Sequence, residues 1–185
     1  MRYFLAFGWG VTVYLTVGSV LEHDPRRRCW SASSRRKKIR DMETRDLYTG
    51  ATRKKKDRSI EHVMPISFLR KGHQWDVLNL AVTHSRLNNW RQARLFIDQD
   101  LKKTSMEILV LDQQTCGRDD RHFVPPDLAE RGRIARICLY MIHYYPYLYP
   151  LFSEQQYQTL HEWCDQYPLS LDELRGLIRR LLVFV

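Results

Sequence analysis

Residues 59–94, SIEHVMPISFLRKGHQWDVLNLAVTHSRLNNWRQAR, decide the fold of this chain. The segment 59–64 is short and rich in β-branched or apolar residues, and Pro65 ends it because proline cannot donate a strand hydrogen bond. Residues 77–83 (VLNLAVT) predict a second short strand, after which the apolar pattern is lost. Ser85 or Asn88 is suited to cap a helix that carries residues 89–96. We therefore expect a β-hairpin with a helix packed across it.

Polar residues of this segment have the chemistry of a one-metal nuclease site. Glu61 and His62 lie at the end of the first strand, and Asn79 and Asn88 follow nine positions apart. In the expected hairpin, His62 and the start of the helix come close together. Carboxylate and amide oxygens suit a hard cation such as Mg²⁺, and a neutral imidazole can take a proton from water. We predict that Glu61 and Asn88 bind the metal and that His62 is the general base.

Composition and charge indicate one domain with a polyanionic partner. The chain has 185 residues, of which 44% are hydrophobic, which is enough for one domain with a sizeable core. The net charge of +9 favours binding to nucleic acid or to an acidic membrane surface. The sequence contains no internal repeat and no glycine-rich phosphate loop.

The positive charge is concentrated in three runs, Arg26–Arg28, Arg35–Lys38 and Arg53–Lys56. Few apolar residues separate them, so residues 20–56 are predicted to form a basic, weakly structured arm. The first two runs are either a solvated tether or a phosphate-binding segment. The third ends five residues before Glu61, so we predict that it binds the nucleic-acid backbone through Arg53, Lys54, Lys55 and Lys56 in a salt-dependent manner.

The N-terminal segment is typical of a secretory signal. Arg2 precedes an uncharged run from Tyr3 to Leu21, and Val17-Gly18-Ser19 offers small residues for a signal peptidase. Residues 1–19 are therefore predicted to be removed, which makes the protein secreted or periplasmic. The alternatives are a membrane anchor, because the run nearly reaches bilayer length, and a buried first helix. Contact with a membrane is expected only if this segment is retained.

The chain has four cysteines, Cys29, Cys116, Cys138 and Cys164. Because their number is even and no Cys-x-x-Cys pair or Cys/His grouping of the zinc type occurs, disulfide bonds are favoured over metal thiolates. Four cysteines can form two disulfide bonds in three ways, and the sequence does not choose among them. Reduced cysteines in the core are the alternative.

The second half of the chain is predicted to be helical. Residues 127–145 place Ile134, Ile137, Cys138 and Met141 on one face of a helix. Capping boxes are expected at Ser153–Gln156 and at Ser170–Glu173. Between the first two helices, the aromatic segment 144–149 is interpreted as a packed loop, with base stacking as the alternative.

The ordered motifs resemble those of a known family. Glu61-His62-x-x-Pro65, Asp76-x-x-Asn79-Leu80 and Leu87-Asn88-x-x-Arg91 are similar to the ββα-metal (HNH-type) nucleases, and in particular to the bacterial endonuclease I family of periplasmic and secreted nucleases. The resemblance continues through the downstream segments 123–126, 131–136, 139–141, 155–163 and 167–168. It spans roughly residues 59–168. It implies an α+β fold, a mostly helical single domain (residues 57–185) around a ββα-metal finger.

The resemblance also implies roles for individual residues. His62 matches the general base, Glu61 and Asn88 match the metal ligands, and Asn79 matches an asparagine that ties the hairpin loop together. Arg91 and Arg136 match arginines that lie near the phosphate or brace the site. Arg133, which precedes Arg136 by one helical turn, is predicted to contact nucleic acid.

The implied activity is divalent-metal-dependent endonucleolytic hydrolysis of DNA, with RNA as an alternative substrate, little sequence specificity and 5′-phosphate products. Mg²⁺ is the expected cofactor, with Mn²⁺ or Ca²⁺ as alternatives, and the protein is expected to be a monomer. Two residues, Leu78 and Ala93, depart from the family pattern. The short segment between His62 and Asp76 also lacks the arginine that is usual there, and Arg70 or Lys71 is the candidate to replace it. A basic nucleic-acid-binding protein that no longer cuts is therefore the alternative.

Overall fold

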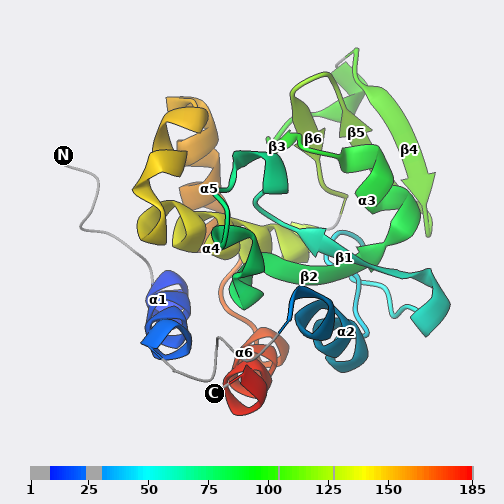
Figure 1. Cartoon of the computed structure of the whole chain (residues 1–185). Coiled ribbons are helices and arrows are strands. Elements are labelled where there is room, and N and C mark those ends of the chain that lie inside the picture. Colours follow the sequence, from blue (N-terminus) through cyan, green and yellow to red (C-terminus); the bar gives the residue numbers. More distant parts are fainter. Residues whose placement is uncertain (1–8, 24–30, 104, 127, 185) are drawn as a thin grey trace.

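The β1–β2 hairpin lies between a small four-stranded sheet and a group of helices, so the fold is α+β (Figure 1). The computed structural model describes residues 9–23, 31–103, 105–126 and 128–184. Strand β1 (Arg58–His62) pairs antiparallel with β2 (Leu80–His84), and Glu61 lies opposite Ala81. Helix α3 (Ser85–Arg91) follows directly and contacts both strands. The predicted hairpin with a helix across it is confirmed.

The second strand begins later than the sequence pattern predicts. Asp76 accepts a hydrogen bond from the Leu78 backbone at 2.9 Å and caps a single 3₁₀ turn, η5 (Val77–Asn79). Residues 77–79 therefore turn before the extended backbone starts at Leu80. Two further 3₁₀ turns, η3 (Ile66–Phe68) and η4 (His73–Trp75), complete the connection from β1.

Asn79 holds this connection closed. Its side chain is fully buried, accepts a hydrogen bond from the Met64 amide at 2.6 Å and donates one to the Met64 carbonyl at 3.0 Å. The Asn79 side-chain amide therefore forms two hydrogen bonds with the backbone of the segment after β1, as a residue of a neighbouring strand would. These bonds fix the position of the end of β1, where His62 lies.

The four-stranded sheet was not predicted from the sequence. Its order is β3 (Leu95–Phe96), β6 (His122–Val124), β5 (Gln114–Arg118) and β4 (Glu107–Leu111), and η6 (Leu101–Lys103) precedes β4. Strands β3 and β6 are parallel and the other pairs are antiparallel. Phe96 and Phe123 bring aromatic rings from this sheet to Tyr48, with centroids 6.1 and 5.1 Å from that ring.

The helical half agrees with the sequence pattern. Helix α4 (Leu128–Tyr144) buries Ile134, Ile137, Cys138 and Met141 as predicted. The aromatic turn η7 (Pro146–Leu151) follows, then α5 (Glu154–Gln166) with the predicted Ser153–Gln156 capping box, then α6 (Leu171–Phe184). Ser170 accepts from the Glu173 amide at 3.1 Å, but the Glu173 carboxylate accepts from Arg136 instead of closing a second box.

Helix α1 (Trp9–His23) packs against α4 and α6. It buries Val11, Tyr14, Val17 and Leu21, and the Tyr14 hydroxyl donates to Glu173 at 3.0 Å. This is the arrangement of a buried first helix. Among the described helices, none combines the length and the hydropathy that crossing a bilayer requires. Removal of residues 1–19 remains a prediction, and residues 1–8 lie outside the described part.

The predicted weakly structured arm is wrong for residues 31–56. Helix α2 (Ala32–Met42) is capped by Ser31 and packs on the hairpin through Arg35 and Ile39. Leu47 and Tyr48 then enter the core with no exposed surface. These two apolar side chains anchor a segment whose composition is otherwise that of a solvated tether. The first basic run, Arg26–Arg28, lies outside the described residues.

Candidate active site

Glu61 is a buried carboxylate with one oxygen already engaged. Its side chain is 3% exposed, and Oε1 accepts hydrogen bonds from the Tyr48 hydroxyl at 2.7 Å and from Arg91. Burial raises the pKa of Glu61, while Arg91 and Tyr48 oppose that rise. Oε2 accepts no hydrogen bond from any residue that the structure describes. Glu61 therefore has one oxygen held by the protein and one left for a ligand.

Arg91 braces this carboxylate. The guanidinium is fully buried and donates to Glu61, to the His62 carbonyl at 3.1 Å and to the Val63 carbonyl at 2.7 Å. Its Nε donates to the Arg94 carbonyl at 3.1 Å, and its plane lies 4.4 Å from the Phe96 ring centroid. These contacts bind α3 to the end of β1 and occupy most of the N–H donors of the guanidinium. Arg91 thus orients Glu61, and its full burial keeps it away from a phosphate.

His62 is the last residue of β1, and its imidazole has an unused nitrogen. Nε2 is buried and finds no hydrogen-bond partner among the described residues. Burial lowers the pKa of His62 to about 4, the nearby cations Arg36 and Arg91 lower it further, and a hydrogen bond to the Gln74 backbone opposes the shift. At neutral pH the ring is therefore uncharged, as a proton acceptor must be.

Asn88 reaches back to β1 from the second turn of α3. Its Nδ2 donates to the Ser59 hydroxyl and to the Ile60 carbonyl, both at 2.9 Å. These are the two residues before Glu61. Since the amide nitrogen is held by the protein, the carbonyl oxygen Oδ1 is the atom available to a ligand.

The predicted limits of this helix need correction. The helix begins at Ser85, where His84 caps it by accepting from the Arg86 amide at 3.0 Å. Asn88 therefore does not open the helix. At the other end, Gln92 takes a positive φ of 55°, which ends α3 after seven residues, so residues 92–96 are not helical.

Glu61 and Asn88 together fit a hard cation. Nowhere in the described ranges do three His, Cys, Asp or Glu side chains form a cluster that could hold a metal. A cation here would take one carboxylate oxygen and one amide oxygen from the protein and complete its shell with water. That is a ligand set that Mg²⁺ accepts readily, because it retains several waters.

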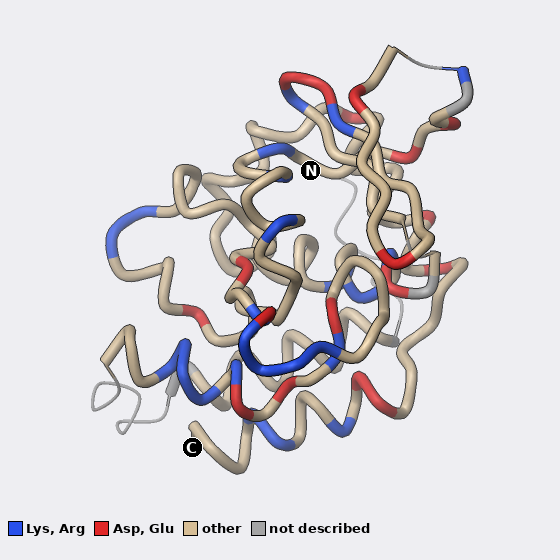
Figure 2. The backbone as a smooth tube through the Cα atoms, turned by 90° about the vertical axis from the view of Figure 1, so that its right-hand side faces the viewer, with Lys and Arg blue, Asp and Glu red and all other residues tan. Residues whose placement is uncertain are grey.

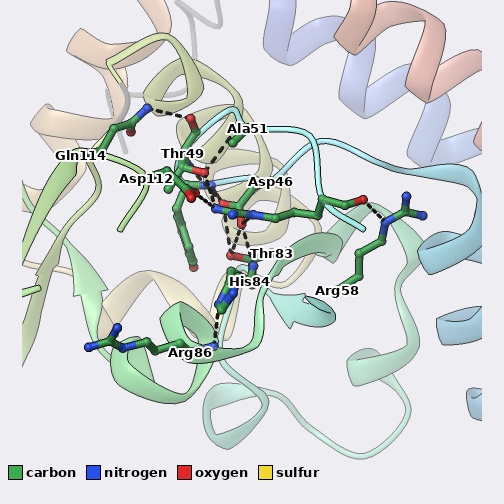
Figure 3. Close-up of polar contacts among 11 residues, drawn as sticks. Asp46, Thr49, Ala51, Arg58, Thr83, His84, Arg86, Asp112 and Gln114 are labelled. Atoms are coloured by element: carbon green, nitrogen blue, oxygen red, sulfur yellow. Dashed lines mark hydrogen bonds and ion pairs between the residues drawn. The ribbon is translucent and has the colours of Figure 1, made fainter. Parts of the chain in front are cut away.

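Arg53 was predicted to bind nucleic acid, and the structure contradicts this. Its guanidinium is 8% exposed and bonds to Asp46 at 2.9 Å, to Thr49 at 2.8 Å and to Asp112 (Figure 3). Asp46 is fully buried and also accepts from the backbone amides of Tyr48, Thr49 and His84. Arg53 therefore supplies the charge that this buried carboxylate needs.

Arg136 and Arg133 are also engaged within the protein. Arg136 is 2% exposed and forms a double hydrogen bond to Glu173, with a further bond to the Tyr167 carbonyl at 2.7 Å. Arg133 donates to both oxygens of Glu43 at 3.1 Å. Both arginines join α4 to neighbouring segments. The roles of Arg136 in catalysis and of Arg133 in nucleic-acid binding stay predictions, and both guanidinium groups already have partners within the protein.

Lys54, Lys55 and Lys56 are exposed, unlike Arg53. Lys55 and Lys56 belong to the 3₁₀ turn η2 (Lys55–Asp57), which leads directly into β1. Figure 2 shows the Lys and Arg positions along the backbone in blue, several of them in the lower half of the view. The Lys55 ammonium contacts Asp41 of α2 at 2.8 Å.

The predicted disulfide framework is also corrected. Cys116, Cys138 and Cys164 are free thiols, and Cys29 lies outside the described residues. Two disulfides among four cysteines would need at least one bond between these three. Cys116 and Cys138 are buried, as the alternative of reduced cysteines in the core predicts.

Sequence patterns missed Tyr48, which holds Glu61, and they left open whether the run Arg35–Lys38, which contains Arg36, binds phosphate. Both residues lie in the segment that was predicted to be a weakly structured arm. The available signal was the apolar pair Leu47-Tyr48 inside a charged stretch. Comparisons add no relative, since no protein-family model and no curated protein matches this chain.

Proposed function

We propose that this protein is a divalent-metal-dependent endonuclease that hydrolyses phosphodiester bonds of DNA, with RNA as an alternative substrate and with little sequence specificity. One observation carries the proposal. At the end of β1, Glu61 and His62 are consecutive residues: the imidazole is neutral and has an unused nitrogen, and Glu61 and Asn88 each keep one oxygen free. The motif resemblance to bacterial endonuclease I nucleases supports the same chemistry.

Each residue would have a defined task. Glu61 and Asn88 would hold Mg²⁺, whose charge stabilises the phosphorane and the leaving oxygen and favours 5′-phosphate products. His62 would accept the proton of the attacking water at Nε2. Tyr48 and Arg91 would fix the orientation of Glu61, and Asn79 would fix the position of His62. Export to the periplasm or the cell exterior, with residues 1–19 as the signal, belongs to the same proposal.

The test is digestion of supercoiled plasmid by the purified protein in Mg²⁺ and in EDTA. We expect nicked and linear products in Mg²⁺ and intact plasmid in EDTA. His62→Ala should slow cutting on the order of a hundredfold or more, because it removes the proton acceptor. His161→Ala is the matched control, since that histidine lies on α5 and takes no part in the site.

Cutting at the full rate by His62→Ala would show that the assigned mechanism is wrong. Binding of DNA in EDTA without cleavage in Mg²⁺, Mn²⁺ or Ca²⁺ would favour the second candidate, a nucleic-acid-binding protein on the same scaffold. Leu78 and Ala93, which depart from the family pattern, are the observation that keeps this candidate in view.

A further inference from the structure

Helix α2 presents three cations on its outer face. Arg36, Lys37 and Arg40 are exposed, whereas Arg35 and Ile39 face the hairpin. At about 100° per residue, the three cations fall within an arc of about 100° on one side of the helix. None of the three forms an ion pair with another described residue, so their charges are available to a partner.

The position of α2 brings this face to the site. The Arg58 guanidinium, at the start of β1, donates to the Arg40 carbonyl at 3.0 Å. Side chains alternate along a strand, so Arg58 and His62 lie on the same face of β1. Because Arg40 meets the start of β1, Arg36 lies one helical turn further, toward the end that carries His62.

A second set of contacts fixes Arg36 there. The neighbouring Arg35 donates to the Trp75 carbonyl at 2.7 Å, and the Arg36 guanidinium lies 5.7 Å from the centroid of the Trp75 ring. Trp75 follows Gln74, whose backbone is hydrogen-bonded to His62.

The lysines before β1 continue the same surface. Lys55 contacts Asp41, the residue that follows Arg40 in α2. The two basic segments are therefore adjacent. We call this surface the basic strip; it consists of Arg36, Lys37, Arg40, Lys54, Lys55 and Lys56.

Two other arginines near the site, Arg91 and Arg53, are buried in ion pairs. Arg70 is exposed and lies 4.2 Å from the centroid of the Tyr147 ring. An acidic membrane surface is disfavoured as the partner, because an interfacial helix needs an outward apolar face and Ile39 is turned inward. A row of exposed cations suits phosphates.

We propose that the sugar-phosphate backbone of the nucleic acid lies along the basic strip, with Arg36 contacting the phosphate next to the cleaved bond. The position of the cleaved bond rests on the proposed nuclease function, whereas binding along the strip does not. Because the cations meet phosphates and no bases, the contact is independent of sequence. Arg36 would supply the phosphate cation that the short segment after His62 lacks.

The test measures the affinity of the full chain for a labelled 20-base-pair duplex at several NaCl concentrations in EDTA, where no cleavage occurs. Each lost phosphate contact reduces the slope of log K against log salt by about 0.9. We expect Arg36→Gln/Arg40→Gln to reduce the slope by about 2. The matched control Lys103→Gln/Arg121→Gln removes the same charge from exposed positions around the four-stranded sheet and should leave the slope nearly unchanged.

The outcomes separate the two proposals. Equal slopes for the α2 double variant and its control would overturn the basic strip, even if the wild-type protein cuts DNA. A reduced slope for the α2 variant in a protein that never cuts would keep the strip and reject the nuclease. Binding to phosphatidylserine vesicles that depends on Arg36 and Arg40, without binding to the duplex, would assign the surface to a membrane and overturn the proposal.

Discussion

Replacing Glu43 by glutamine tests how the helices are held on the hairpin. Glu43 ends α2, and its side chain is 13% exposed. It accepts hydrogen bonds from Arg133 of α4, from Arg180 of α6 and, at 3.3 Å, from the Val82 amide of β2. One carboxylate therefore joins three elements around the hairpin. Glutamine keeps the shape but leaves two arginines without their counter-charge.

The size of the expected loss of stability follows from the pKa of Glu43. Burial alone would raise it, but Arg180 and Arg133 lower it from 4.5 to about 2. A downward shift of about 2.5 units corresponds to about 3 kcal/mol of folding free energy at pH 7. Loss of one partner of a buried ion pair costs a similar amount, about 3–5 kcal/mol. We therefore expect Glu43→Gln to lower the free energy of unfolding by about 3 kcal/mol at pH 7.

The pH dependence has a definite sign. Because the folded-state pKa lies below the unfolded value, the stabilisation is complete above about pH 4.5 and is lost as pH falls toward 2. Urea unfolding of both proteins should therefore give a difference of about 3 kcal/mol at pH 7 and less than half of it at pH 3. The Glu107 side chain is 66% exposed, so the control Glu107→Gln should change the free energy of unfolding by no more than about 0.5 kcal/mol. The reasoning would be refuted if Glu43→Gln lowered the free energy of unfolding by no more than the Glu107→Gln control does. It would also be refuted if the loss were the same at pH 7 and at pH 3.

Three further predictions follow from other contacts. Arg53→Ala should lower the free energy of unfolding by about 3 kcal/mol or more, because it removes the counter-charge of a buried carboxylate, and should leave the salt slope of DNA binding unchanged. Gly132→Ala should destabilise by about 1–3 kcal/mol in urea unfolding despite the better helix propensity of alanine, because the new methyl would overlap the Tyr167 carbonyl oxygen. Cys116 and Cys138 should react with a thiol reagent at pH 8 only after unfolding, since burial raises the pKa of both thiols to about 12.

Local signals in the sequence predicted the elements that depend on neighbouring residues. Strand β1 lies before Pro65, as predicted, although it ends at His62, and the Ser153–Gln156 capping box begins α5. The four-stranded sheet escaped prediction because its strands are short and β3 has only two residues. Its order depends on the pairing of β3 with β6, which no short-range pattern specifies.

The site was predictable in part for the same reason. Glu61, His62 and Asn88 lie within one segment, so their spacing indicates a common site. Tyr48 and Arg36 come from a segment whose composition favours disorder, and their placement depends on tertiary packing of Leu47, Ile39 and the Trp75 loop. Composition describes the average of a segment, whereas two buried side chains are enough to order it.

The fold buries part of the positive charge, and this changes what the net charge means. The buried cations of the described residues are all arginines, namely Arg35, Arg53, Arg91, Arg131, Arg136 and Arg180. A guanidinium can satisfy several acceptors at once, so it can be buried against carboxylates and carbonyls, whereas an ammonium is more strongly hydrated. Part of the charge of +9 therefore belongs to the interior. Among the remaining cations, Arg36, Arg40 and the lysine run are exposed and lie on adjacent segments, which is why we propose that a phosphate binds there.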